Sequence, residues 1–516
     1  MNRSTREQFD RDAADHTVVP VWRVLVADTE TPVSAFAKLA EDRDATLFES
    51  VEHGERWGRF SFIALDPFVT LRADGLSVQV TPPPRDDELV ADLMAGVPTD
   101  SGILNALDVL LKRLSAPSYP GMPPFHGGVS GYLGYDVVRE IERLPSTPHD
   151  DLGMPDAVMS VTRLVAAFDH FAQRLWLVDN VYVGTDPSAE MLDRLFDRSQ
   201  RRLDDLAQRL KTSDTNTRLL EPPDGFEPVV PTSVSIPADQ FRDAVEVARE
   251  YIAAGDIFQV VLSRRFEVEL KVDPFEIYRS LRQVNPSPYM FFMRQKDAAD
   301  VTLIGSSPEP MAQVIDGEAI IRPIAGTRFR GSNEDHDRRL AAELSEHPKE
   351  RAEHVMLVDL ARNDVGRIAE FGTQRMTELL TVERYSHVMH LTSEVRGRVR
   401  ADATAVDVFR AAFPAGTVSG APKVRAMEII DEIEPVKRGP YGGVFGYFDF
   451  SGNLDTAIVI RTMVCTEGRG FVQAGAGVVV GSDPADEELE TRNKANALLH
   501  AIGLAQTSGE IADRSS

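Results

Sequence analysis

Two acidic segments in the C-terminal half of the chain, PKERAEHVMLVDLARND and DPADEELETRNK, carry glutamates spaced three residues apart. They contain Glu350 and Glu353, and Glu487 and Glu490, respectively. Residues three apart share a face of a helix, so each segment predicts a helix with two neighbouring carboxylates. Two such faces could meet around one Mg²⁺, which prefers oxygen ligands and keeps part of its water. The alternative is a pair of solvated helices with internal ion pairs, such as Glu490 with Lys494.

A second kind of chemistry is indicated by small and cationic residues near the ends of predicted strands. Gly475 and Gly477 lie in FVQAGAGVVVGSDP, where the missing side chains let backbone amides approach an anion. Arg461 ends the apolar run AIVIR, and a guanidinium there can bind a carboxylate through two hydrogen bonds. The same residues also fit a plain glycine bend and a structural ion pair. His354 and His390, taken singly, fit structural roles.

The elements that must position these groups alternate between strands and helices. The proline-rich residues 212–237 predict a linker between an N-terminal region, 20–185, and a C-terminal region, 238–506, with a disordered tail at 507–516. The last three strands indicate a meander, so we expect an α+β fold with a large antiparallel-rich sheet and helices outside it. The predicted strands of the C-terminal region are Asp256–Phe266, Tyr289–Met293, Thr302–Gly305, Gly442–Asp449, Thr456–Cys465 and Phe471–Val480. Its predicted helices are Ala238–Ala254, Pro348–Arg362, Asp407–Ala412, Ala421–Ile433 and Pro484–Ile502.

The bulk composition restricts the class of protein. The chain has 516 residues, 81 Asp and Glu against 56 Lys and Arg, and a formal net charge of -25. A field of this sign repels phosphate backbones, so we expect no nucleic-acid partner, and an anionic substrate needs local cations or a metal. The single cysteine, Cys465, and the N-terminus without an apolar core predict a cytoplasmic protein with no disulfide and no membrane segment.

The C-terminal region also contains a series of motifs in a fixed order. They are GDIFQVVLSRRF (255–266), NPSPYMFF (285–292), GSSPE (305–309), RPIAGTRFR (322–330), the 348–364 segment, HVMHLTSEV (387–395), FPAGTVSGAPK (413–423), YGGVFGY (441–447), AIVIRT (457–462), QAGAG (473–477) and ETRNKA (490–495). From Ile236 to about Leu504 this series resembles the chorismate-utilising enzymes, and the N-terminal half resembles them more weakly. The resemblance implies a β-sandwich flanked by helices, with a deep site between its two sheets.

The resemblance also implies roles for individual residues. Glu353 and Glu490 would bind Mg²⁺, with Glu350 and Glu487 supporting them through water, and Mg²⁺ would bind the ring carboxylate of chorismate. The residues expected to bind the substrate are Gly326, Thr327, Tyr441, Arg461, Gly475, Gly477 and Lys494. Those expected to serve proton transfer and leaving-group stabilisation are Glu309, Thr327 and His390.

Two positions indicate which reaction of the family to expect. Isochorismate-forming relatives carry a water-activating lysine where this chain has Gln259, which cannot act as a base. Aminodeoxychorismate synthases typically place a nucleophilic lysine where this chain has Ala325. Direct attack by ammonia, followed by elimination of pyruvate to give anthranilate, is therefore the expected reaction. The alternatives are aminodeoxychorismate formation and a non-catalytic tryptophan-binding regulator.

The resemblance finally implies a partner and a regulator. Cys465 lies within a strand pattern and not at a glycine-flanked elbow, so we expect ammonia to come from glutamine through a separate glutamine amidotransferase subunit, in a heterotetramer. L-tryptophan is expected to inhibit the enzyme as the end product of the pathway. The residues expected to bind it are Glu49, Ser50, Asn285, Pro288, Tyr289, Met290, Phe445, Gly446 and Tyr447. The alternative is that the apolar members are core between the two halves.

Overall fold

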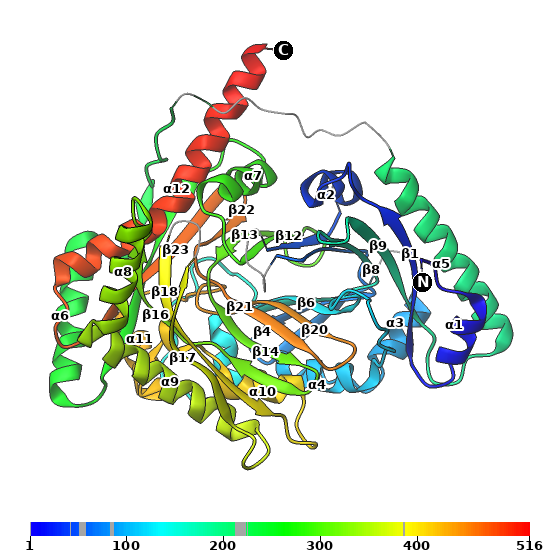
Figure 1. Cartoon of the computed structure of the whole chain (residues 1–516), viewed down its shortest axis with the longest axis horizontal. Helices are drawn as coiled ribbons and strands as arrows, with labels where there is room; N and C mark the ends of the chain where they lie inside the picture. Colours follow the sequence, from blue (N-terminus) through cyan, green and yellow to red (C-terminus); the bar gives the residue numbers. More distant parts are fainter. Residues whose placement is uncertain are drawn as a thin grey trace.

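The computed structural model describes residues 2–41, 43–50, 58–82, 87–211, 223, 225–384 and 388–515. Figure 1 shows a strand-rich centre with helices on its outside. Within the described residues there are two sheets, A with 12 strands and B with 11, and neighbouring strands in both are antiparallel. This arrangement confirms the α+β fold with a large antiparallel-rich sandwich flanked by helices.

The strands of each sheet follow one another in space in an order that differs from the order of the chain. Sheet A runs β1 (Val18–Val26), β9 (Arg174–Tyr182), β8 (Leu164–Asp169), β3 (Phe60–Leu65), β2 (Ala45–Glu49), β12 (Tyr289–Gln295), β13 (Val301–Ser307), β22 (Thr462–Thr466), β23 (Arg469–Val478), β11 (Gln259–Glu269) and β10 (Ser233–Val234), with β19 (Gly420–Ala421) beside β11. Sheet B runs β16 (Ile324–Phe329), β18 (Val388–Arg398), β15 (Glu318–Ile321), β14 (Pro310–Ile315), β21 (Leu454–Ile458), β20 (Val444–Asp449), β6 (Gly128–Leu133), β7 (Ala157–Val161), β4 (Val69–Asp74) and β5 (Ser77–Thr81), with β17 (Arg375–Arg384) beside β18.

The helices begin at residues that suit a helix N-terminus. The His347 side chain accepts the amide of Glu350 before Pro348, and Asp483 accepts the amides of Ala485 and Asp486 before Pro484. The helices are α1 (Arg6–Asp12), α2 (Pro32–Ala40), α3 (Asp87–Met94), α4 (Ile103–Arg113), α5 (Ala189–Leu210), α6 (Ala238–Ala254), α7 (Pro274–Val284), α8 (Glu334–Glu346), α9 (Pro348–Ile368), α10 (Ala405–Ala412), α11 (Lys423–Ile433) and α12 (Pro484–Ser515), with 3₁₀ turns η1 (Tyr135–Glu140) and η2 (Gly416–Val418). No helix of the described residues is long and apolar enough to cross a membrane.

Both sheets contain strands from the two halves of the chain, which meet at one place in each sheet. In sheet A, β2 pairs with β12, and in sheet B, β6 pairs with β20. The predicted linker therefore separates two stretches of sequence that fold together. Residues 212–222 and 224 of that linker lie outside the described residues, and its last part contains β10.

Aromatic and aliphatic side chains fill the space between the two sheets. The rings of Phe291 on β12 and Phe445 on β20 stack with their centroids 3.9 Å apart. Tyr132, Leu303 and Phe471 belong to the same buried cluster. Burial of apolar surface from both inner faces holds the sheets together.

The predicted meander of the last three strands is wrong. β20 and β21 belong to sheet B, whereas β22 and β23 belong to sheet A, so the run Thr456–Cys465 leaves one sheet and joins the other. The crossing lies at residues 459–461, and Arg461 has a φ of +48°, which is rare for a residue with a side chain. Both sides of the crossing are buried, so the apolar pattern of the sequence does not reveal it.

Helix α12 continues to Ser515, into the segment 507–516 for which the sequence predicts a disordered tail. The sequence after Gln506 contains no proline, the residue that interrupts a helix most strongly. Ser508 is buried, and Gln506 donates a hydrogen bond to the carbonyl of Glu269.

Candidate active site

A small cavity marks the place where α9 and the end of β13 approach each other. Its volume is about 40 Å³, and its lining includes Glu309, Thr417 of η2, and Leu357 and Leu360 of α9. Glu353 precedes Leu357 by four residues and therefore lies on the same side of the helix. The predicted catalytic glutamate and the predicted metal-binding helix thus face one region of the molecule.

Glu309 is an enclosed carboxylate with a perturbed pKa. Its Oε1 accepts a hydrogen bond of 2.9 Å from the hydroxyl of Thr417. Burial raises the pKa of Glu309 to about 7, although Thr417, Lys494 and Arg461 act in the opposite direction. The electrostatic influence of Lys494 and Arg461 shows that these two predicted substrate cations lie near the carboxylate. A group with this pKa can both give and take a proton at neutral pH.

Tyr441 and two glycines lie beside these cations. Lys494 donates a hydrogen bond of 2.9 Å to the carbonyl of Gly475. A Cβ atom at Gly475 would lie 2.6 Å from the hydroxyl oxygen of Tyr441, and one at Gly477 would lie 2.9 Å from Nε2 of Gln259. A side chain at Gly475 would therefore collide with Tyr441, and one at Gly477 would displace the end of Gln259.

His390 lies on β18, paired with β16. Its Nδ1 is 3.0 Å from the carbonyl oxygen of Gly326, which can only accept, so Nδ1 carries the proton and Nε2 is the basic nitrogen of the neutral ring. Burial lowers the pKa of His390, and the nearby Arg461 lowers it further. The structure thus brings His390 and Arg461 together. The side chain of Thr327 lies outside the described residues.

One predicted Mg²⁺ ligand, Glu490, and one predicted supporting carboxylate, Glu350, are paired with cations. Glu490 pairs with Lys494 at 2.7 Å, and Glu350 pairs with Arg328 at 3.1 Å. Among the described residues, no group of three or more His, Cys, Asp or Glu side chains is arranged to hold a metal. Mg²⁺ commonly takes only one or two carboxylates and completes its shell with water and substrate oxygens. Glu353 and Glu490 carry oxygen donors of the kind that Mg²⁺ prefers.

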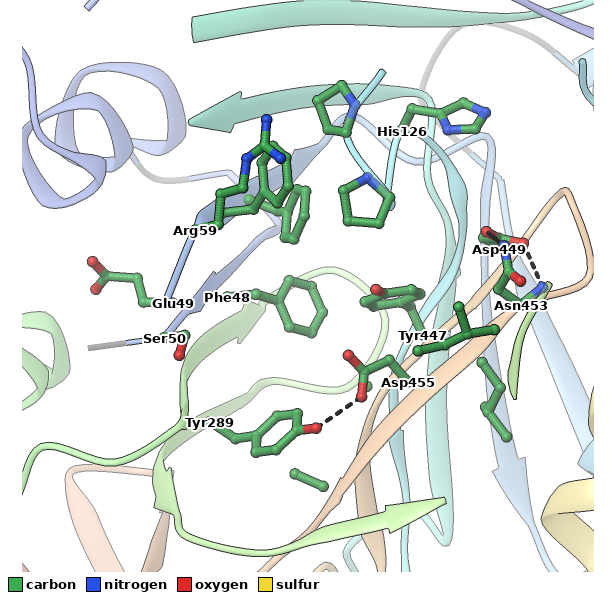
Figure 2. Close-up of a pocket in the computed structure, with 18 of the residues that line it drawn as sticks. Phe48, Glu49, Ser50, Arg59, His126, Tyr289, Tyr447, Asp449, Asn453 and Asp455 are labelled. Carbon is green, nitrogen blue, oxygen red and sulfur yellow. Dashed lines mark hydrogen bonds between the residues drawn. The ribbon is translucent and has the colours of Figure 1, made fainter. Parts of the chain in front are cut away.

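A second and larger cavity, of about 430 Å³, lies between the sheets. Figure 2 shows its lining, with Phe48 and Tyr447 facing its interior. Of the residues predicted to bind tryptophan, Glu49, Ser50, Pro288, Tyr289, Met290, Phe445, Gly446 and Tyr447 all line it. Asn285 is not among the lining residues. It donates a hydrogen bond of 3.1 Å to the hydroxyl of Ser306 on β13, the strand beside β12 in sheet A.

Glu49 and Ser50 lie on opposite sides of the chain at the end of β2. The carboxylate of Glu49 accepts hydrogen bonds from Tyr278 at 2.5 Å and Arg282 at 3.1 Å, both on α7. Figure 2 accordingly shows the Glu49 side chain directed away from Tyr447. The hydroxyl of Ser50 is buried and has no hydrogen-bond partner among the described residues. Ser50 is therefore the better placed of the two to bind a polar ligand.

Asp455 lines the large cavity and forms a polar cluster with Tyr289 and Gln313 that the sequence does not predict. Asp455 accepts hydrogen bonds of 3.0 Å from the Tyr289 hydroxyl, as drawn in Figure 2, and of 3.0 Å from the Gln313 amide. Burial raises the pKa of Asp455 to about 6. Alternating polar residues in strands resemble solvent-facing positions, so the sequence carries no signal for Asp455.

Thr417, the partner of Glu309, is also absent from the predicted site residues, although it lies in the motif FPAGTVSGAPK.

Comparisons with known proteins agree with this geometry. The profile of the family described as chorismate binding enzyme matches residues 77–500. Anthranilate synthase component 1 of Mycobacterium tuberculosis is 45% identical over 98% of this chain and 96% of its own length. The Pseudomonas aeruginosa protein of the same name is 44% identical over 98% of this chain and 100% of its own.

Solved structures show the same relationship. Anthranilate synthase component I from Streptococcus pneumoniae is 34% identical, with a TM-score of 0.71 over 92% of this chain and 99% of that one. The menaquinone-specific isochorismate synthase of Escherichia coli shares the fold, with a TM-score of 0.67 over 96% of this chain and 98% of its own at 18% identity. The chain belongs to the chorismate-binding enzymes and, within them, to the anthranilate synthase component 1 proteins.

Proposed function

We propose that this chain catalyses the Mg²⁺-dependent reaction of chorismate with ammonia that releases pyruvate and yields anthranilate. The observation that carries the proposal is the convergence of Glu309, with a pKa near 7, on the cations Arg461 and Lys494. An acid of this pKa beside two cations suits a dianionic substrate that must lose a hydroxyl group and then a ring proton. The names of relatives that are 44–45% identical over 98% of this chain support the same reaction.

The chain's own residues divide this work between binding and proton transfer. Arg461, Lys494 and the backbone at Gly475 and Gly477 would hold the enolpyruvyl carboxylate, with Tyr441 beside them. Glu309 would give or take protons at the ring. Bound Mg²⁺ would neutralise the ring carboxylate and polarise the ring system, held by Glu353 and Glu490 with Glu350 and Glu487 behind them.

Two buried positions favour ammonia as the nucleophile. Gln259 is 5% exposed, and its Oε1 has no hydrogen-bond partner among the described residues. An amide oxygen cannot activate water, but it can accept a hydrogen bond from ammonia. Ala325 is buried on β16 and offers no nucleophile of its own.

The large cavity supports regulation by an aromatic amino acid. It is lined by Phe48, Phe445 and Tyr447, with the Ser50 hydroxyl at one wall. We propose L-tryptophan as its ligand and feedback inhibition as the result. Ammonia would come from a glutamine amidotransferase subunit, since the buried thiol of Cys465, whose pKa is raised by burial, is unsuited to glutamine hydrolysis.

The test is anthranilate fluorescence from the purified chain with chorismate, Mg²⁺ and ammonium at alkaline pH, with and without tryptophan. A signal that requires Mg²⁺ and falls with tryptophan supports the whole proposal. Chorismate consumption without anthranilate would indicate aminodeoxychorismate formation. Tryptophan binding without consumption, also in the presence of the amidotransferase subunit, would indicate a regulator without catalysis.

A further inference from the structure

A buried ion pair lies against the outer edge of β11, behind the proposed active site. Glu434 and Arg438 are each 4% exposed. Arg438 Nη2 lies 2.6 Å from Glu434 Oε1, and its Nε lies 2.9 Å from Oε2. Along this edge, β19 pairs with Gln259 and Val260 at the start of β11. The other short strand, β10, pairs with Phe266 and Glu267 near the end of β11. Between these two short strands, no described strand pairs with the edge.

The ion pair satisfies the backbone of β11 in that gap. The carbonyl of Val261 accepts a hydrogen bond of 2.7 Å from Arg438. The amide and hydroxyl of Ser263 donate to Glu434 at 2.7 Å and 3.0 Å. A neighbouring strand would ordinarily pair with these backbone groups. The two charged side chains therefore replace a missing piece of strand.

The opposite edge of β11 faces the two glycines of the proposed substrate site. Val261 is the register partner of Gly477, and Ser263 is the register partner of Gly475. The ion pair thus holds β11 at the two residues that lie directly opposite these glycines, and the backbone groups of Val261 and Ser263 point away from the glycines, to the outer edge. A shift of β11 there would move the backbone that must approach the substrate carboxylate.

Arg438 also contacts two other parts of the site. Its Nη1 donates a hydrogen bond of 2.6 Å to the carbonyl of Val418, the residue after Thr417. Its guanidinium lies over the ring of Tyr441, 5.6 Å from the centroid. One side chain therefore joins β11, the turn that carries the Glu309 partner, and the tyrosine beside Gly475.

We propose that Glu434 and Arg438 are a positioning pair that fixes the binding site for the substrate's enolpyruvyl carboxylate. This inference rests on the proposed function, because it takes chorismate as the ligand at Gly475 and Gly477. A buried ion pair is expensive to desolvate and adds little net stability compared with apolar packing. Its value here is the set of directed hydrogen bonds, which apolar side chains cannot make.

The test compares Arg438→Lys with Arg425→Lys in steady-state assays with saturating Mg²⁺ and ammonium. Lysine keeps the charge but cannot pair in a bidentate manner and also reach two carbonyls. We expect Arg438→Lys to raise the KM for chorismate about tenfold or more, with kcat within about threefold of wild type. Arg425 is a partly exposed arginine of α11 with its own carboxylate partners, and its variant should match wild type.

A second, milder variant covers the case in which Arg438→Lys does not fold. Ser263→Ala removes one hydrogen bond to Glu434 and should raise the same KM about threefold. A KM within error of wild type in the folded variants overturns the inference, whatever their melting temperatures. A wild-type chain that neither binds nor converts chorismate instead overturns the proposed function, so the two failures are distinguishable. An unchanged tryptophan affinity in both variants supports a local effect on the substrate site.

Discussion

The backbone amide of Ser306 donates a hydrogen bond of 3.2 Å to the carbonyl oxygen of Arg461. Ser306 is also the register partner of Met290, which lines the large cavity, and its hydroxyl is bonded by Asn285. One residue therefore connects the proposed tryptophan cavity with the proposed substrate cation.

This connection predicts a mixed effect for Asn285→Ala. The substitution removes the hydrogen bond from the Asn285 amide to the Ser306 hydroxyl, which keeps its bonds to the backbone carbonyl of residue 285 and to Ser287, and so partly loosens the strand end that holds Arg461. We expect the KM for chorismate to rise about threefold and tryptophan inhibition to weaken by a similar factor. Initial rates over a grid of chorismate and tryptophan concentrations measure both. A change in inhibition alone would mean that Asn285 acts only at the cavity.

Ser50→Ala should separate regulation from catalysis. Removing the hydroxyl takes away a hydrogen bond to the ligand without disturbing any described partner, so the inhibition constant for tryptophan should rise about tenfold. The rate without tryptophan should stay close to that of wild type. Isothermal titration with tryptophan and the uninhibited rate are the two measurements. Loss of both functions together would indicate a structural role for Ser50.

Glu309 predicts a pH dependence of both rate and stability. Its pKa of about 7 in the folded chain exceeds the ordinary value of 4.5, so the folded state retains a proton that the unfolded chain releases between these values. Its contribution to stability is therefore present at low pH and is lost as the pH rises from about 4.5 to about 7. Glu309→Gln should flatten the melting temperature across this window and remove the inflection near pH 7 from the rate profile.

Thr417→Val provides an independent check on that assignment. The Thr417 hydroxyl lowers the pKa of Glu309, so its removal should move the rate inflection to higher pH. An inflection that stays in place in Thr417→Val, or persists in Glu309→Gln, would assign the ionisation to another group.

Glu490→Gln should weaken Mg²⁺ binding measured in the presence of chorismate. Loss of one of two carboxylate ligands should raise the Mg²⁺ concentration needed for half-maximal rate about a hundredfold. Asp486→Asn is the matched control, because Asp486 is an exposed acid one turn earlier on α12. Equal Mg²⁺ requirements in the two variants would contradict the ligand assignment.

Gln259→Leu addresses the nucleophile. If the buried Oε1 orients ammonia, the KM for ammonium should rise about tenfold while the KM for chorismate changes little. Leucine is similar in size, so the packing against Gly477 is retained. The reverse pattern, with chorismate affected and ammonium unaffected, would place Gln259 among the substrate contacts.

The parts of the structure that the sequence predicted well depend on local chemistry. Pro348 and Pro484 mark helix starts because proline fixes φ and lacks the amide hydrogen that a first turn leaves unused. The cluster of Glu309, His390, Arg461 and Lys494 was predicted through ordered motifs, and the structure brings these residues together.

The parts that were missed depend on long-range contacts. The crossing at Arg461 follows from which sheet each strand joins, and the sequence pattern is the same for both choices. Glu434 and Arg438 stand in EIEPVKRGP, which resembles a charged surface turn, yet both are buried because β11 lacks a neighbour at that point. Glu49 lines the cavity as predicted, and the sequence does not reveal that its carboxylate also accepts hydrogen bonds from Tyr278 and Arg282 of α7.

The pairing of β2 with β12 and of β6 with β20 has a consequence for how the chain reaches its native state. During synthesis the first half leaves the ribosome long before β12 and β20 exist, so strands such as β2 and β6 then lack their neighbours. Contacts of such large sequence separation form slowly and leave apolar edges open to aggregation. We therefore expect either half expressed alone to be insoluble, and the nascent chain to need a chaperone until its C-terminal strands emerge.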